Sequence, residues 1–68
     1  MTDLPIAAVI RIAKNSGAER VGSDAAEMMV KQAEAYIAKL AKEANRLASH
    51  AGRKTIKAED IKMAAESK

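Results

Sequence analysis

The chain of 68 residues contains no cysteine, no phenylalanine and no tryptophan, and Tyr36 is its only aromatic residue. Without cysteine no disulfide can form, which suits a reducing compartment. No apolar run reaches the ~18–20 residues that a membrane-spanning helix needs, and no signal peptide opens the sequence. We therefore expect a cytoplasmic protein with no membrane partner.

Residues that build catalytic and metal sites are also scarce. His50 is the single histidine, and one histidine without cysteine cannot make a zinc site. No serine stands in a pattern that pairs a nucleophile with a base, because the serines occupy caps, surface positions and the tail. We expect no enzyme activity, no metal, no cofactor and no small-molecule substrate.

What the chain does contain is alanine and positive charge. Lysine and arginine number 12 against 9 aspartate and glutamate, so the net charge is +3 and a dimer would carry twice that. The pI near 9.5 makes a polyanion a sensible partner. We interpret residues 1–68 as a single domain without tails, which is small for a stable core of its own.

The middle of the chain predicts one long helix. It begins at Ser23, a good N-cap residue, and contains no glycine or proline as far as Ala51. Its apolar residues recur at alternating spacings of four and three: Ala26, Val30, Ala33, Ile37, Leu40, Ala44, Leu47 and Ala51. Such a helix is roughly 43 Å long, whereas a compact globule of this size has a diameter of roughly 28 Å. The stripe therefore predicts a partner chain, with a dimer core of Val30, Ala33, Ile37, Leu40 and Ala44.

Two short helices are predicted on either side of the long one. The first covers residues 5–15, with Pro5 in its first turn, where a missing N–H costs nothing. The other covers residues 57–66. Gly17 and Gly52 follow two of the helix ends as left-handed caps. The connecting loops are then residues 18–22 and 53–56.

Several segments resemble archaeal histones, and the resemblance covers nearly the whole chain. They are Leu4-Pro5-Ile6-Ala7, Arg11-Ile12-Ala13-Lys14, Gly17-Ala18-Glu19-Arg20-Val21 and the twelve consecutive residues from His50 to Ile61. The resemblance implies an all-α histone fold, in which two chains form an intertwined head-to-tail dimer. Each first loop then lies beside the partner's second loop, where Arg20-Val21 and Thr55-Ile56 would form short β-like bridges.

The same resemblance implies that the loops and the first helix bind double-stranded DNA. Arg20 would enter the minor groove, although a solvated arginine is the commoner interpretation of the loop taken alone. Arg11, Lys54 and Thr55 would contact phosphate. Lys14 would add general positive charge. Lys57 belongs with Arg53 and Lys54 to a group of three cations within five residues, and is also counted as DNA-binding, although so small a group taken alone is usually a solvated loop. Arg53 is interpreted as structural, in an ion pair with Asp60.

The resemblance further implies assembly of dimers side by side on DNA. Leu47, His50 and Asp60 would form the contact between dimers, and Gly17 would allow successive turns of wrapped DNA to stack. We expect a nucleoid protein that compacts DNA with little base preference, as a homodimer or paired with a paralogous histone. The alternative is a heterodimerising histone-fold subunit of a transcription complex, which could dispense with Arg20, Lys54 and Thr55.

Overall fold

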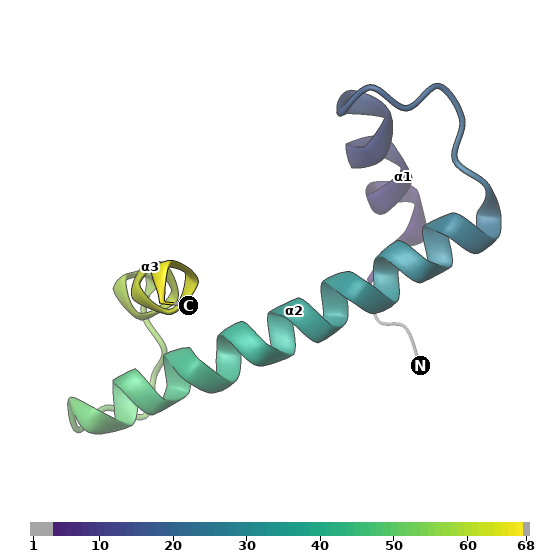
Figure 1. Ribbon diagram of the computed structural model, residues 1–68. Coiled ribbons are helices and arrows are strands. Elements are labelled where there is room, and N and C mark those ends of the chain that lie inside the picture. The colour runs from purple at the N-terminus through teal and green to yellow at the C-terminus, as the bar shows by residue number, and fades with distance from the viewer. Residues whose placement is uncertain (1–3, 68) are drawn as a thin grey trace. The chain divides into compact units, whose positions relative to one another are not determined.

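The computed structural model describes residues 4–67, and these form three helices and no strand. Helix α1 covers Ile6–Asn15, α2 covers Ser23–His50 and α3 covers Ala58–Glu66 (Figure 1). This confirms the predicted all-α order of a short, a long and a short helix. The β-like bridges predicted for the two loops pair with a second chain, so they stay a prediction.

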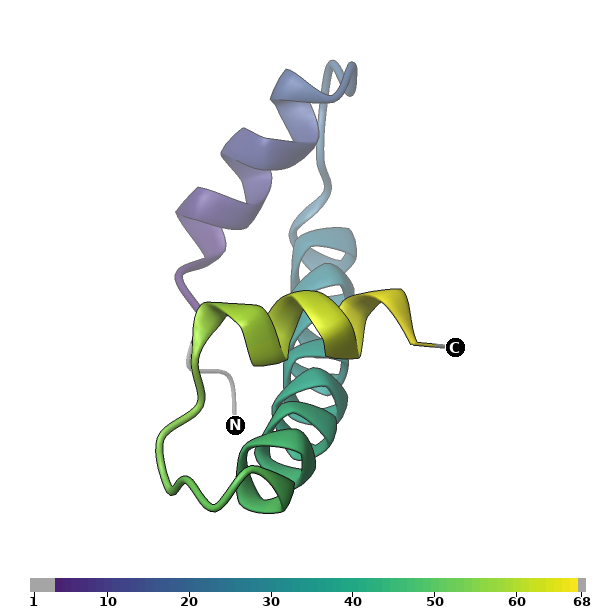
Figure 2. The same ribbon diagram turned by 90° about the vertical axis from the view of Figure 1, so that its left-hand side faces the viewer.

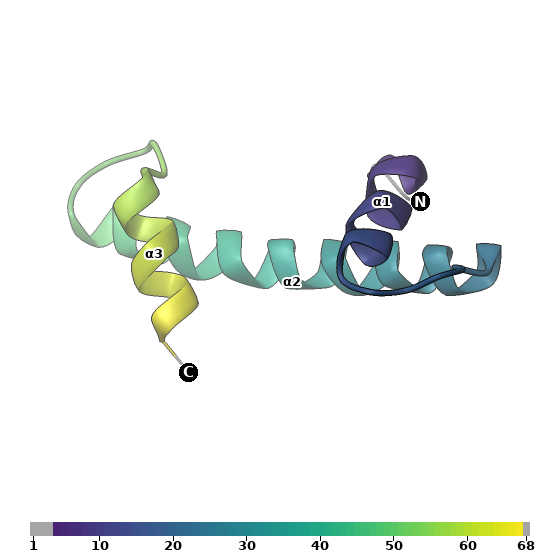
Figure 3. The ribbon, with the colours of Figure 1, turned by 90° about the horizontal axis from the view of Figure 1, so that it is seen from above.

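The chain divides into two compact units, Met1–Ala35 and Tyr36–Lys68. In the first, α1 lies beside the first half of α2, and a loop returns from the end of α1 to the start of α2 (Figures 1 and 3). In the second, α3 crosses the second half of α2 (Figures 2 and 3). Each unit therefore pairs one short helix with one half of the long helix.

The core of the first unit centres on α2. Ala26 and Val30, one turn apart on one face of the helix, are fully buried. Because α1 is the only other helix of this unit, α1 and its loop must cover them. Val9 and Ile10 of α1 are only partly buried, and no described residue of α1 is fully buried. One chain therefore buries the α2 side of this contact more completely than the α1 side.

The core of the second unit consists of small side chains. Ala44 and Ala48 of α2 are fully buried, and Ala64 of α3 is 7% exposed. The predicted stripe includes Ala51 but not Ala48, and at these two positions the prediction is wrong. Helix α2 ends at His50, so Ala51 falls in the following turn, where helical periodicity no longer applies, and is exposed.

Burial in one chain is uneven along the predicted dimer core. Val30 and Ala44 are fully buried, Ala33 and Leu40 are partly buried, and Ile37 is 50% exposed. Ile37 follows Val30 by seven residues and precedes Ala44 by seven, so all three belong to one helical face. The short helices thus cover both ends of this face and leave its middle open. The dimer core itself stays a prediction.

Helices α1 and α2 each end in a glycine turn of the same type. In both, the N–H of the residue after the glycine donates to a carbonyl five residues earlier; after α2, Arg53 donates to Ala48 at 2.9 Å. This is a Schellman motif, which needs a left-handed residue at the glycine position. Gly17 has φ +115° and Gly52 has φ +77°. Both predicted left-handed caps are confirmed, and both loops begin directly after them.

The predicted helix starts are displaced by one residue. Pro5 lies just before α1 in extended conformation and its carbonyl accepts the N–H of Val9 at 3.3 Å. Ser23 is the first residue of α2, so its predicted N-cap role was wrong. The carbonyl of Gly22 accepts a hydrogen bond from the N–H of Ala26 at 2.9 Å, and this bond begins the series of backbone hydrogen bonds of α2.

Helix α3 begins at a buried aspartate. Asp60 is 3% exposed, and its Oδ2 accepts the N–H of Lys57 at 2.8 Å, while its own N–H donates to the Lys57 carbonyl at 2.9 Å. Lys57 therefore lies just before the helix, whereas the sequence predicted it as the first helical residue. Arg53 adds two hydrogen bonds to the Asp60 carboxylate, at 2.8 and 3.0 Å. These bonds, from Arg53 first and the Lys57 N–H second, lower the pKa of Asp60 from 3.8 to about 2.

We expect Asp60 to make folding sensitive to acid. Because its pKa is lower in the folded chain, its contribution to stability is complete above 3.8 and is lost as the pH falls toward 2. Asp60→Asn should lower the Tm by several degrees at neutral pH and should flatten the pH dependence in that window. Circular dichroism melts from pH 2 to 7 measure both effects. Glu66→Gln, an exposed change of equal charge on α3, is the control; equal effects of the two variants would contradict this role for Asp60.

Candidate nucleic-acid interface

The first unit presents three cationic side chains. Arg11 and Lys14 are three residues apart on α1, which places them on neighbouring positions of one helix side. Arg20 follows in the loop, three residues after Gly17. All three side chains are exposed, and the described residues form no ion pair with any of them. Their positive charge is therefore available to a partner molecule.

The second unit presents a loop that is held by one arginine. The Arg53 guanidinium donates to the Thr55 carbonyl at 3.1 Å and also to the Asp60 carboxylate. Arg53 thus ties the loop backbone to the start of α3, as its predicted pairing with Asp60 requires. With 26% of its side chain exposed and its Nη atoms engaged, Arg53 is a support for the loop more than a contact residue.

The remaining loop groups face outward. Lys54, Thr55 and Lys57 are exposed, and the described residues supply no partner for the Thr55 hydroxyl or N–H. Lys57 uses its backbone at the start of α3, so its ammonium group is separate from that bond. The structure therefore brings the predicted residues Lys54, Thr55 and Lys57 together in one short, supported loop that displays hydrogen-bond donors.

The residues predicted for assembly have different environments. Leu47 is partly buried, His50 is the exposed last residue of α2, and Asp60 is nearly buried. The Asp60 Oδ1 accepts one hydrogen bond, from Arg53, so it retains a second lone pair. Gly17 is exposed, and a Cβ at that position would meet nothing within 4 Å.

One interaction of α2 was not anticipated from the sequence. Arg46 donates to Glu43 through Nε at 3.0 Å and through Nη2 at 2.5 Å. The hydrogen bonds from Arg46 lower the pKa of Glu43 and raise that of Arg46. Their spacing of three residues was the available signal, since side chains at that distance are neighbours on a helix.

The chemistry of these groups favours contact with phosphate. Arginine, lysine, a threonine hydroxyl and a free loop N–H are all donors, and such groups make most contacts to nucleic-acid backbones. Among residues 4–67, no three His, Asp or Glu side chains gather as a metal site would require. No described helix is both long and apolar enough to cross a bilayer. With a single aromatic residue, Tyr36, the chain has little means to stack unpaired bases.

Comparison with known proteins agrees with this fold. The profile of a family described as "Histone-like transcription factor (CBF/NF-Y) and archaeal histone" matches residues 2–65. One of the subunits of archaeal histone HAN1 from Thermococcus zilligii is 45% identical over 67 residues, which cover 98% of this chain and 100% of that protein. Probable archaeal histone 3 from Methanocaldococcus jannaschii is 41% identical over 64 residues, covering 94% and 96%. The three helices described above are therefore a histone fold, and the chain belongs to the family of histone-like transcription factors and archaeal histones.

Proposed function

We propose that this protein packages double-stranded DNA as a histone. The observation that carries the proposal is the second loop, where Lys54, Thr55 and Lys57 display donors while Arg53 and Asp60 hold the backbone in place. A plain helical dimer would have no need of such a loop. Positive charge on exposed loops, together with a net charge of +3, provides the electrostatic term that dominates binding to DNA.

Each DNA-facing residue has a distinct proposed role. Arg20 enters the minor groove, where a narrow groove concentrates negative potential and guanidinium is easier to desolvate than ammonium. Arg11 and Lys54 contact phosphate, and Thr55 does so through its hydroxyl and N–H. Lys14 and Lys57 add attraction that is not tied to one phosphate. None of these roles reads a base edge, so sequence preference follows from DNA bendability.

A homodimer completes this proposal. Ile37 is half exposed and Tyr36 is 57% exposed in the middle of α2, so one chain leaves apolar surface that a second chain can cover. Each of the two units buries very few side chains, too few for independent stability. We infer that residues 1–68 act as one histone-fold domain within an intertwined dimer. Pairing with a paralogous histone would use the same surface.

The second candidate function is a heterodimerising subunit of a transcription complex, since the family description includes transcription factors. Such a subunit needs only the apolar face of α2. The joint exposure of Arg20, Lys54 and Thr55 favours the packaging histone instead. Side-by-side assembly of dimers on DNA would then use Leu47, His50 and Asp60, and Gly17 would allow close stacking of successive turns.

The packaging function predicts strong salt dependence. If a dimer neutralises about 6–10 phosphates, log K should fall against log salt concentration with a slope of roughly −5 to −9. Fluorescence anisotropy with a random-sequence duplex over a salt series measures this slope. A slope near zero, or a large preference for one short sequence over random duplex, would rule out the packaging function.

Arg20→Ala should weaken binding to every duplex about tenfold and reduce the salt slope by about two, since a dimer contains two copies of the residue. Lys62→Ala, which removes one exposed cation from α3, is the matched control and should have a smaller effect. Helical content and dimer mass should be unchanged in both variants. Loss of dimerisation in Arg20→Ala would show that the residue is structural instead.

The proposed contact between dimers predicts that His50→Glu keeps dimers folded and abolishes cooperative compaction. A glutamate at the end of α2 would approach the Asp60 carboxylate of the neighbouring dimer, and two like charges repel. Because neighbouring dimers on DNA are held at high effective concentration, weak contacts are sufficient there. Single-molecule contraction of long DNA against protein concentration is the measurement. Unchanged cooperativity in the variant would place the interface elsewhere.

A further inference from the structure

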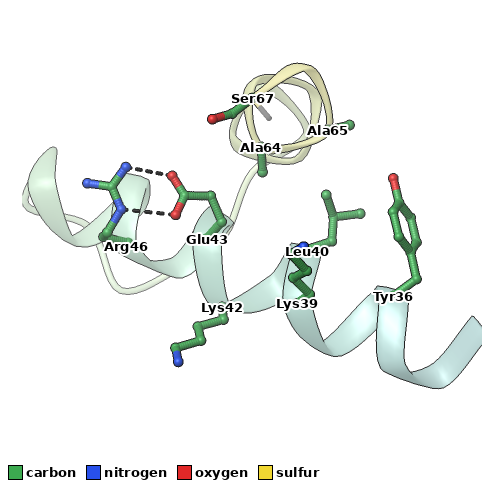
Figure 4. Close-up of a pocket in the computed structure, with 9 residues that line it drawn as sticks. All are labelled: Tyr36, Lys39, Leu40, Lys42, Glu43, Arg46, Ala64, Ala65 and Ser67. Carbon is green, nitrogen blue, oxygen red and sulfur yellow. Dashed lines mark hydrogen bonds and ion pairs between the residues drawn. The ribbon is translucent and has the colours of Figure 1, made fainter.

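The second unit contains an open groove between α2 and α3. Its volume is about 950 Å³, and its apolar lining comes from Leu40, Ala64 and Ala65. Figure 4 shows Leu40 and Tyr36 rising from α2 toward α3, while Ala64 points back toward α2. Tyr36, at one end of the groove, is 57% exposed although most of its surface is apolar. Such a surface is suited to the apolar face of a helix.

The groove has a positively charged border. Lys39, Lys42 and Arg46 all line it, and Glu43 is the single acid among its lining residues. Glu43 is already bound to Arg46, as Figure 4 shows, whereas Lys39 and Lys42 form no ion pair within the described residues. The ammonium group of Lys42 extends away from α3. With these three cations and one acid, the half of α2 in this unit, residues 36–50, has a net charge of +2.

The other half of α2 has the opposite charge. Residues 23–35 contain the carboxylates Asp24, Glu27 and Glu34 and one ammonium group, that of Lys31. Their net charge is −2. Helix α2 as a whole is thus neutral, but its first half is acidic and its second half is basic.

The helix macrodipole accounts for only part of this pattern. Carboxylates are favourable in the first turn of a helix and cations in the last, and the effect fades within one turn. That explanation covers Asp24 but not the interior residues Glu34, Lys39 and Lys42. Opposite charges three or four residues apart do occur within each half, for example Glu27 with Lys31 and Lys39 with Glu43. Each half nevertheless keeps an excess of one sign, and this excess is open to a partner molecule.

We propose that this charge polarity of α2 selects the chain that occupies the groove. The occupant is the acidic first half of α2 from a second copy, so the inference rests on the homodimer proposed above. Head-to-tail pairing places an acidic half beside a basic half twice, once in each groove, because a two-fold contact repeats itself. Parallel pairing, or a partner without this polarity, places like charges together or loses the attraction. The apolar lining provides affinity, and Asp24, Glu27, Lys39 and Lys42 determine direction and partner choice.

A charge exchange tests this proposal without DNA. One variant combines Lys39→Glu with Lys42→Glu, so that both halves of α2 become acidic. The other combines Asp24→Lys with Glu27→Lys, so that both halves become basic. In a head-to-tail dimer each variant pairs halves of like net charge with itself and halves of opposite net charge with the other variant. Sedimentation gives the self-association constants, and native mass spectrometry of the mixture distinguishes heterodimer from homodimer.

At 0.1 M salt each variant alone should self-associate about tenfold or more weakly than the parent chain, since like charges at an interface repel. The equimolar mixture should recover an affinity within about threefold of the parent, almost entirely as heterodimer. Both effects should shrink at 1 M salt, because the screening length falls from about 10 Å to about 3 Å. Recovery on mixing remains measurable even where a variant does not fold by itself.

Neutral variants are the matched control. Lys39→Gln with Lys42→Gln, mixed with Asp24→Asn and Glu27→Gln, changes the same positions without creating attraction, so mixing should give no recovery. A charge-reversed mixture that associates no better than its components would overturn the proposal, as would a parent chain that does not self-associate. DNA binding by the parent is measured separately. Loss of DNA binding with intact charge-exchange recovery would refute the packaging function alone.

Discussion

The structure depends on the mismatch between one long amphipathic helix and two short ones. Helix α2 has 28 residues, whereas α1 has 10 and α3 has 9. The short helices can therefore bury apolar positions near the two ends of α2, and they do so at Val30 and Ala44. They leave Ile37 half exposed between these positions. Apolar area exposed in water has a free-energy cost that a second chain can remove, so the lengths of the helices favour the proposed dimer.

The short side chains in the core have a second consequence. Alanine is the strongest helix former, but it contributes little apolar area when it is buried. Ala26, Ala44 and Ala48 are completely buried and Val30 is the largest fully buried side chain. One chain thus has well-formed helices and a small core. In the proposed dimer, the choice of partner and the stability of the fold are linked, because the partner supplies the apolar burial that one chain lacks.

The loops show how a small fold presents rigid contact groups. A glycine in left-handed conformation closes the helix before each loop, at Gly17 and at Gly52. In the second loop Arg53 then holds both a loop carbonyl and the Asp60 carboxylate at the start of α3. Backbone donors that are already ordered lose less entropy when they bind a phosphate than donors on a mobile loop. In the proposed function, the partly buried Arg53–Asp60 ion pair therefore aids phosphate binding by restricting the loop.

The sequence by itself determined the helices, both glycine turns and the family. Periodicity, the absence of glycine and proline from α2, and the need for a positive φ are properties of short segments, so they can be recognised without coordinates. The exposed cations Arg11, Arg20 and Lys54 were also predictable, because charged residues off an apolar stripe remain in water. Only the resemblance to a known family connected them with DNA.

The tertiary structure decided which side chains are buried or hydrogen-bonded within the chain and which remain exposed. It placed Ala48 in the core and Ala51 outside it, because the turn at Gly52 ends the helix one residue before the stripe would continue. It gave Asp60 three hydrogen bonds, two from Arg53 and one from the Lys57 N–H. Within residues 4–67 it left the Thr55 hydroxyl and N–H without a partner. It also formed the groove beside Leu40. These features depend on contacts between separate segments, whose geometry no local pattern contains.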